Sequence, residues 1–584
     1  MTYLSSAALP RCLFSLFVVL TGAGSSFAEV TFRVQLPTPR EHYRTYDPDK
    51  AGLELMGKVL QKLDPKRREA AMKLLASGKP ESLPPIEPGQ AVEMLKSLGL
   101  DEYEPELLEI FLHRSGVLEV IPPEYRESLT PIVHDALLGF LDGLSDERLA
   151  ERFIALARLP KDTPRGEKIL ALISRLPALQ KVGQIIARVN GIPPDISRAL
   201  QSLENGISTM SRDDLVNYIV EEAGRETIEK YQIRFDDRIL AEASVGAVIK
   251  GSFVPPGSDR RQEMVCKLIK PYVVTGLPEE MEIVDALIDL VDQHADFYRL
   301  GNIPLKDLFR DIKAKLAEEL RVKQEQENFK RAYEYYRGNR RVKVPEVYEF
   351  STPNVTFMEF LHGEKITDAF PGDTKRRARL ARRLADVMSF DSLFSRRPTA
   401  IFHGDPHAGN VLHVTDDPKN PYLIGLLDWG LLGQFTRERR LHMVQLNLAL
   451  RDKNRKKLRR HVGALLDGGL PDDEVRRERV FALAEKALGA SGSTYEVYSS
   501  LVAELAKNGF VLDPEFTLYI KAQVTLDGIY RELDPSLKLD RYLESRVSRR
   551  ILQEFPKRLL LLPAWNYRGY RSLLSNGDVF GYVF

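Results

Sequence analysis

Two short polar segments late in the chain carry the strongest chemical signal. Residues 402–412 read Phe-His-Gly-Asp-Pro-His-Ala-Gly-Asn-Val-Leu, and residues 426–430 read Leu-Leu-Asp-Trp-Gly. Phosphoryl transfer needs a carboxylate beside the acceptor and hard oxygen ligands that hold Mg²⁺ on the phosphates. Asp405 fits the first role, and Asn410 and Asp428 fit the second. We therefore predict a phosphoryl-transfer site that binds magnesium.

A lysine within an apolar strand is the second signal. Residues 263–271 read Glu-Met-Val-Cys-Lys-Leu-Ile-Lys-Pro and place Lys267 among apolar neighbours. An ammonium group in such surroundings needs a partner, because burying an unpaired charge is costly. The expected partner is Glu325, on a long helix predicted from residue 304 to residue 337. Such a pair would fix Lys267 as a point charge for nucleotide phosphates.

The third signal is a loop of small residues between two predicted strands. Residues 240–248 read Leu-Ala-Glu-Ala-Ser-Val-Gly-Ala-Val. Small side chains let backbone N–H groups approach a phosphate closely. Nucleotide contacts are therefore predicted from Ala241, Ala243, Ser244 and Gly246.

The strands and helices around these motifs predict an α+β, two-lobed protein-kinase-like fold. Five segments rich in β-branched residues predict a small antiparallel sheet: 234–241, 247–254, 263–270, 342–350 and 354–360. Short strands are also expected at 411–414 and 422–427, within a helical lobe that follows. The predicted divisions are a signal peptide or anchor at 1–28, a helical N-terminal region at 29–165, a helical extension at 166–232, a strand-rich lobe at 233–360 and a helical lobe and tail at 361–584.

The N-terminus has the pattern of a secretory signal. Arg11 precedes an apolar run at residues 12–20, and small residues lead to Ala28. The run is shorter than the roughly 20 residues that a spanning helix needs, so an uncleaved anchor is the alternative. We expect an exported or membrane-associated protein.

Composition excludes several other classes of site. The net charge of +1 gives no reason to expect nucleic-acid binding. Two cysteines, one of them within the predicted signal, cannot form an intramolecular disulfide framework. The ten histidines are scattered along the chain, so no metal beyond magnesium is expected.

A helix predicted at residues 176–189 completes the pattern. Leu179, Val182 and Ile186 are predicted to be buried on one face, while Lys181 and Gln184 project from another. The segment Lys-Val-Gly-Gln at 181–184 resembles the K-x-G-Q helix of UbiB-like (AarF, ADCK) atypical kinases. The loop at 241–248 resembles their alanine-rich nucleotide loop, and the resemblance covers roughly residues 176–435.

This resemblance implies an ATP- and Mg²⁺-dependent enzyme. It implies that Lys181, Gly183 and Gln184 form a gating helix over the active site, and that Met358 and Glu359 contact the nucleotide. The family is linked to isoprenoid-quinone (ubiquinone) biosynthesis and lipid homeostasis at membranes. A quinone precursor or an anionic lipid is therefore the expected further partner.

Several residues depart from the family pattern. The family's E-x-D element reads Glu319-Leu-Arg321 here, which places a cation where the K-x-G-Q helix is expected to dock. Glu242 and Ala247 replace alanine and glutamine in the loop, and His-Gly-Asp replaces His-Ala-Asp at 403–405. A carboxylate at Glu242 opposes phosphate binding unless it holds a metal or points away.

Two other functions fit the same residues. The His-Gly-Asp and Leu-Asp-Trp-Gly motifs are also similar to those of aminoglycoside- and choline-kinase-like phosphotransferases. A pseudokinase scaffold is the alternative from another class, because an exported protein in a bacterial periplasm would lack ATP.

Basic helices at 375–383 and 453–460 are candidates for binding anionic lipid, or are solvated helix faces with acidic neighbours. No C-terminal spanning helix is predicted.

Overall fold

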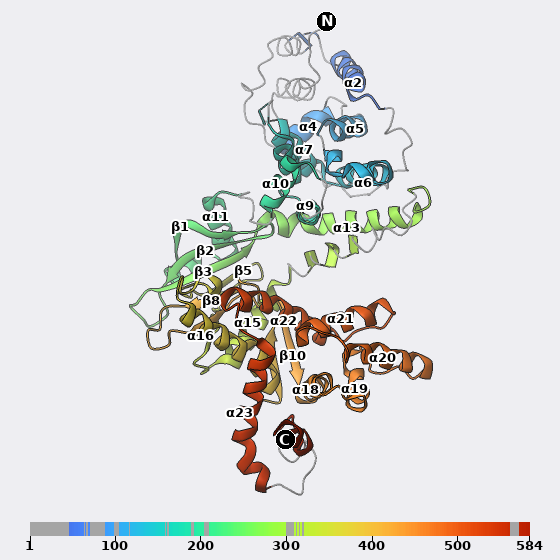
Figure 1. Cartoon of the computed structure of the whole chain (residues 1–584). Helices are drawn as coiled ribbons and strands as arrows, with labels where there is room; N and C mark the ends of the chain where they lie inside the picture. Colours follow the sequence, from blue (N-terminus) through green and yellow to red (C-terminus); the bar gives the residue numbers. More distant parts are fainter. Residues whose placement is uncertain are drawn as a thin grey trace. The chain divides into compact units, whose positions relative to one another are not determined.

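The computed structural model divides the chain into two compact units. It describes residues 46–62, 65, 68–69, 88–97, 104–115, 117–157, 159–160, 163–187, 192–203, 210–298, 309–310, 312–314, 316–317, 320–560 and 572–583. The first unit runs to Gln262 and resumes from Cys266 to Leu320, and the second comprises Glu263–Val265 and the chain from Arg321 onward (Figure 1). The predicted signal at 1–28 lies outside the described residues.

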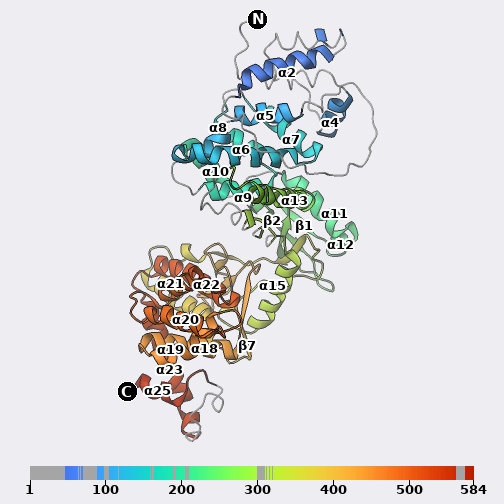
Figure 2. The ribbon, with the colours of Figure 1, turned by 90° about the vertical axis from the view of Figure 1, so that its right-hand side faces the viewer.

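Short helices build the N-terminal part of the first unit. α5 packs against α2 and α6, α4 packs against α7, and α8 packs against α10 (Figure 2). Most of these helices have 12 residues or fewer, which is too short to be stable alone in water, so burial of one face against a neighbour stabilises them. The helices are α2 (Pro48–Lys62), α4 (Pro88–Ser97), α5 (Glu104–Ser115), α6 (Arg126–Asp142), α7 (Asp146–Ala157), α8 (Arg165–Ile173), α9 (Pro177–Ile186), α10 (Pro194–Ser202), α11 (Arg212–Ala223) and α12 (Arg225–Lys230).

Three consecutive strands follow these helices. β1 (Arg234–Glu242), β2 (Gly246–Phe253) and β3 (Gln262–Ile269) lie side by side in that order (Figure 1). β1 and β2 are antiparallel, and burial along β2 alternates residue by residue, as the two faces of a sheet require. The prediction of strands at 234–241, 247–254 and 263–270 is confirmed to within a residue at either end.

The helix after β3 was not predicted. α13 (Pro271–Gln293) begins with proline in its first turn and packs against α6 and α9. Its buried residues include Ile283, Val284, Leu287 and Val291, which recur at helical spacing. An internal glycine and an internal proline obscure this period in the first half of the helix.

The predicted continuous helix from residue 304 to residue 337 is wrong. Leu320 and Arg321 are not helical, and α15 (Val322–Tyr336) begins after them. The apolar stripe that includes Ile312, Leu316 and Leu320 would continue at Lys323 and Gln324, but both are exposed. α15 instead buries Val322 and Glu325, which do not fall at the positions where the helical spacing of the preceding stripe would continue.

Two small sheets lie in the second unit besides β5 (Val355–Glu359). One has the order β4-β9-β8-β6, and β7 and β10 form an antiparallel pair. The predicted strand 342–350 is wrong in extent and place: β4 covers two residues and pairs in parallel with β9. Pro345, which has no N–H to donate, follows shortly after β4. The strands are β4 (Val342–Lys343), β6 (Gly363–Lys365), β7 (Thr399–His403), β8 (Val411–Val414), β9 (Leu423–Leu426) and β10 (Leu432–Thr436).

Helices complete the second unit around an aromatic core. Trp429, Phe435, Tyr519 and Tyr530 are all buried in one hydrophobic cluster. The small sheets and many helices confirm the predicted α+β class. In the described part of the chain, every helix falls short of the length or apolarity that crossing a membrane requires. The helices are α16 (Thr374–Ala385), α17 (Asp391–Phe394), α18 (Arg437–Arg451), α19 (Arg455–His461), α20 (Glu474–Ala487), α21 (Thr494–Lys507), α22 (Pro514–Leu533), α23 (Leu539–Leu560) and α25 (Asn576–Val583).

Candidate active site

The β8–β9 hairpin sets the places of Asn410 and Asp428. Val411 at the start of β8 lies opposite Leu426 at the end of β9. The N–H of Leu427 also donates to the carbonyl oxygen of Asn410 at 2.9 Å. The hairpin thus brings the residue before β8 and the segment after β9 to the same end of the sheet. The two predicted magnesium ligands come from this end.

The loop between β7 and β8 is closed by its own hydrogen bonds. Asn410 Nδ2 donates to the carbonyl oxygen of Asp405 at 3.1 Å. The N–H of His407 donates to the same oxygen at 2.9 Å, and the N–H of Asn410 donates to the carbonyl of His407 at 2.8 Å. Because Nδ2 of Asn410 bonds to the loop, Oδ1 is the amide atom suited to ligate a hard cation.

His403 ties this loop to the strand end that precedes Asp428. Its Nδ1 accepts the N–H of Asp405 at 3.2 Å, so Nε2 carries the proton and donates to the carbonyl of Leu427 at 2.7 Å. Burial lowers the pKa of His403, although Asp428 and Asp405 both act to raise it. The ring is therefore a neutral structural link, and both carboxylates lie close enough to influence it.

Asp428 adopts a backbone conformation that L-residues rarely use. Its φ of 55° lies in the left-handed region. The N–H of Gly430 donates to Asp428 Oδ1 at 3.2 Å, and the fully buried Trp429 side chain anchors the turn between them. Strain of this kind persists only where the surrounding structure enforces it, and it is common at functional sites.

Sequence reasoning missed Asn328, which supports this turn. Asn328 is buried on α15, and its Nδ2 donates to the carbonyl oxygen of Trp429 at 2.9 Å. It lies three residues after Glu325, which is also buried on α15. Residues three apart share a helix face, so this spacing could have identified Asn328.

The predicted lysine and its partner belong to different units. Lys267 is half-buried on β3 of the first unit, between the buried Cys266 and Leu268. Glu325 belongs to the second unit, so the Lys267–Glu325 pair stays a prediction.

Met358 and Glu359 end β5 in the second unit. Met358 is buried, and the Glu359 carboxylate pairs with Lys343 Nζ at 2.9 Å. The N–H of Glu359 donates to the carbonyl of Glu346 at 2.9 Å. The side chain of Glu359 is therefore engaged within the unit, and contact with a nucleotide at these two residues stays a prediction.

The small-residue loop is a tight turn between β1 and β2. The N–H of Ala243 donates to the carbonyl of Gly246 at 2.8 Å, and Tyr272 Oη donates to the carbonyl of Ser244 at 3.1 Å. A Cβ at Gly246 would lie 2.7 Å from the carbonyl oxygen of Leu268, so only glycine allows this approach of β2 to β3. Ala241 lies just before the turn, within β1.

The extra carboxylate in this loop has a cation beside it. Glu242 Oε1 lies 2.7 Å from Lys270 Nζ, and the Lys270 side chain is fully buried. Burial lowers the pKa of Lys270, while Glu242 acts to raise it. The pairing offsets the negative charge that Glu242 would otherwise present to a phosphate.

The K-x-G-Q residues pack α9 against the end of α10. Gln184 Nε2 donates to the carbonyl of Leu203 at 3.1 Å, and a Cβ at Gly183 would lie 2.8 Å from Leu203 Cδ1. Lys181 is half-buried. The structure thus gives Gly183 and Gln184 a packing role, and a gating role for the helix stays a prediction.

The predicted buried face of α9 is wrong in phase. Leu179 is buried as predicted, but Val182 and Ile186 are half-buried, and Gln180 and Gly183 are buried instead. The close approach at Gly183 turns this side of α9 toward its neighbours.

A buried carboxylate caps the start of the same helix. The N–H of Ala178, in the first turn of α9, donates to Glu280 Oε2 of α13 at 2.7 Å, and Arg148 of α7 pairs with Glu280. Burial raises the pKa of Glu280 to about 7, although Arg148 and the Ala178 N–H act to lower it.

Both basic helices make contacts with the rest of the second unit. In α16, Arg377 Nη1 donates to the carbonyl oxygens of Thr367 and Ala369 at 2.7 and 3.0 Å. In α19, Lys457 pairs with Asp578 and Arg459 pairs with Glu485, each at 2.7 Å. Ion pairs with acidic neighbours thus neutralise part of the positive charge of α19.

Comparison with known proteins places these motifs in one family. The family model of the ABC1 atypical kinase-like domain matches residues 202–462. "Probable protein kinase UbiB" of Xanthomonas campestris pv. campestris (strain B100) is 28% identical over 449 residues, which cover 72% of this chain and 79% of that protein. The same protein of Xylella fastidiosa (strain M12) is 27% identical over 453 residues, with the same shares covered.

A solved structure of the complex of Rv3197 with erythromycin, from Mycobacterium tuberculosis, covers 61% of this chain and 87% of that one, with 16% identity and a TM-score of 0.39. The matched domain includes β1–β3, the β7–β8 loop and Asp428, and the relatives extend the match over most of the chain. Residues 202–462 thus match an ABC1 atypical kinase-like domain, and the chain is similar to UbiB proteins over 72% of its length.

Proposed function

We propose that this chain binds MgATP and acts as a phosphotransferase or ATPase. One observation carries the proposal: the β8–β9 hairpin and the His403 link bring Asp405, Asn410 and the turn at Asp428 to one end of a sheet. These are the residue types that hold and transfer phosphoryl groups in kinases.

Each side chain has a distinct proposed task. Asn410 Oδ1 and the Asp428 carboxylate offer oxygen ligands, which suit magnesium. Asp405 is the residue proposed to orient an acceptor hydroxyl and to take its proton. When bound, MgATP supplies the phosphoryl group, and the metal neutralises charge on the phosphates. Lys267 and the backbone N–H groups of the 241–246 loop are the proposed contacts for the phosphates.

The acceptor is proposed from the relatives and from the sequence. The name UbiB of the relatives and the family resemblance support a role in isoprenoid-quinone metabolism or lipid homeostasis. A quinone precursor or an anionic lipid is the proposed partner. The signal-like segment at residues 1–28 supports export or membrane attachment through the N-terminus.

The test is thermal unfolding of the full chain with and without MgATP. A ligand at a hundred times its dissociation constant stabilises a protein by about 2.7 kcal/mol. We expect this stabilisation to disappear in Lys267→Ala and Asp428→Asn. Asparagine tolerates the left-handed region, so the second variant preserves the turn. Asp416→Asn, at the far end of the same hairpin, is the matched control and should behave as the unaltered chain.

Turnover is then measured separately from binding. In Asp405→Asn we expect MgATP to stabilise the chain as before while phosphate release or transfer falls by a factor of at least a hundred. Absence of stabilisation at millimolar MgATP in the unaltered chain would refute the proposal and favour a scaffold. Stabilisation without release or transfer would identify a pseudokinase.

A further inference from the structure

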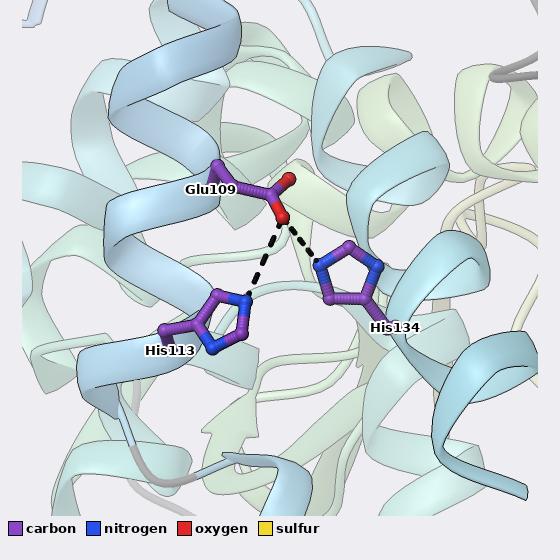
Figure 3. Close-up of side chains that lie close together, drawn as sticks. All are labelled: Glu109, His113 and His134. Atoms are coloured by element: carbon purple, nitrogen blue, oxygen red, sulfur yellow. Dashed lines mark hydrogen bonds and ion pairs between the residues drawn. The ribbon is translucent and has the colours of Figure 1, made fainter. Parts of the chain in front are cut away.

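A polar cluster lies inside the N-terminal helices, outside the site described above. Glu109 and His113 are four residues apart on α5, and His134 lies on the neighbouring helix α6 (Figure 3). One ligand-type atom from each residue lies within 4.8 Å of the other two. The prediction that the histidines are scattered is thus wrong for this pair.

Glu109 is the centre of the cluster. Its Oε1 lies 2.9 Å from His134 Nε2 and 3.6 Å from His113 Nε2 (Figure 3). Two ligands of one tetrahedral zinc ion, each about 2.1 Å from the metal, are about 3.4 Å apart. The observed separations lie on either side of that value, so small side-chain shifts would give both histidines and Glu109 a common metal.

His113 supplies a second, independent observation. Its Nε2 is buried and makes no hydrogen bond within the described part of the chain. The contact of 3.6 Å with Glu109 Oε1 is too long for one. A buried ring nitrogen without a hydrogen bond is costly, and a metal ion at this point would satisfy it.

The groups behind His134 resemble the outer shell of a metal site. His134 Nδ1 lies 2.9 Å from Asp135 Oδ1, and Tyr298 Oη donates to Asp135 Oδ2 at 2.8 Å. A carboxylate on the second ring nitrogen fixes the orientation of a metal-binding histidine and raises its basicity. In the structure both ring nitrogens of His134 face a carboxylate oxygen at 2.9 Å, so Nδ1–H donates to Asp135 and Nε2–H donates to Glu109. Loss of the Nε2 proton would leave a lone pair that points toward Glu109 and the metal position.

Charge favours a divalent ion in these surroundings. Glu109, His134 and Asp135 are all buried. A divalent cation would take the place of the single positive charge that a protonated His134 places between the carboxylates of Glu109 and Asp135. Two imidazoles and one carboxylate match the preferences of zinc.

We propose that Glu109, His113 and His134 form a zinc-binding site that joins α5 to α6, with Asp135 as a positioning residue. The site is separate from the proposed nucleotide site and does not depend on it. Binding forms bonds from Nε2 of each histidine and from a Glu109 oxygen to the metal, and the Nε2 proton of His134 that bonds to Glu109 is released to solvent.

The experiment measures zinc itself in the full-length chain. The chain is stripped with a chelator and dialysed against zinc, and bound metal is determined by mass spectrometry together with competition against a chromophoric chelator. We expect one zinc per chain, and its loss in His113→Ala and Glu109→Gln. Asp135→Asn should weaken zinc binding by a factor of about 10 to 100.

Two controls separate this site from adventitious binding. His442→Ala alters a histidine pair in the second unit for which the described residues offer no third ligand, and Asp428→Asn alters the proposed magnesium site. Both should retain the zinc. Cobalt in place of zinc should give visible absorption bands in the unaltered chain that are absent in His113→Ala. His113→Gln replaces this variant if the alanine chain does not fold.

Hydrogen exchange measures whether bound zinc stabilises α5 and α6. Zinc at a hundred times its dissociation constant should slow exchange there about a hundredfold, and not in His113→Ala. A chain that holds less than half an equivalent of zinc, or one that holds the same zinc after His113→Ala and Glu109→Gln, would overturn the proposal.

Discussion

Replacing Glu242 by alanine should destabilise the first unit, although alanine is the residue that the family loop carries there. The change removes the carboxylate that pairs with Lys270 at 2.7 Å and leaves a fully buried ammonium group. Removal of one partner of a buried ion pair typically costs about 3–5 kcal/mol. The Tyr272 ring, 5.9 Å from Lys270 Nζ, offers a weaker partner, so we expect the lower end, about 3 kcal/mol.

Hydrogen exchange followed by mass spectrometry is the suitable assay, because it reports each part of the chain separately. Each 1.4 kcal/mol changes an equilibrium tenfold, so exchange of β1 and β2 amides should accelerate by roughly a hundredfold. Exchange in α18 to α22 should be unchanged. Glu242→Ala combined with Lys270→Met should recover most of the protection, since the pair is then replaced by apolar groups.

The result that would refute this reasoning is a Glu242→Ala chain with unaltered exchange in β1 and β2. Failure of Lys270→Met to restore protection would equally contradict it, because the loss would then have another cause. A double-mutant cycle of the two positions measures the coupling directly.

Three further predictions concern single positions. Burial and repulsion from His442 lower the pKa of His461 to about 4, and burial lowers the pKa of His442, whose Nδ1 lies 3.0 Å from His461 Nδ1. Below pH 6.5 the unfolded chain therefore binds more protons than the folded chain. The free energy of unfolding should be at its full value above pH 6.5 and should fall by up to about 3 kcal/mol toward pH 4. Urea unfolding followed by tryptophan fluorescence checks this, and an equally steep fall in His461→Gln would contradict it. Gly246→Ala places a Cβ 2.7 Å from a backbone oxygen, so it should cost about 1–3 kcal/mol, seen as faster exchange in β2 and β3. Asn328→Leu removes the donor to the Trp429 carbonyl and should cost about 1–3 kcal/mol and weaken MgATP stabilisation; unaltered nucleotide binding would show that the turn does not need this bond.

The elements that the sequence predicted well are those with a local pattern. β8 and β9 lie at 411–414 and 423–426, where β-branched and apolar residues form short runs. β1 to β3 have the same signal. The polar motifs at 402–412 and 426–430 are assigned to phosphoryl transfer because their residue types and order suit that reaction, and their roles stay predictions.

The features that the sequence did not predict depend on contacts between distant residues. The phase change at Arg321 ends one helical stripe and starts another, which composition alone does not show. Glu242 meets Lys270 only because the β1–β2 turn folds back onto the end of β3. Glu109 and His134 meet only because α5 packs on α6. Each of these contacts is decided by packing, for which a single sequence has no local signal.

The neutral His403 ring makes the β7–β8 loop insensitive to mild acidification. A ring whose pKa is depressed by burial stays uncharged in mildly acidic surroundings, so its bonds to Asp405 and Leu427 persist there. The β7–β8 loop should therefore keep its shape on either side of a membrane across which the pH differs. Any loss of turnover on acidification would then report the ionisation of the carboxylates or of the acceptor, rather than a collapse of the loop.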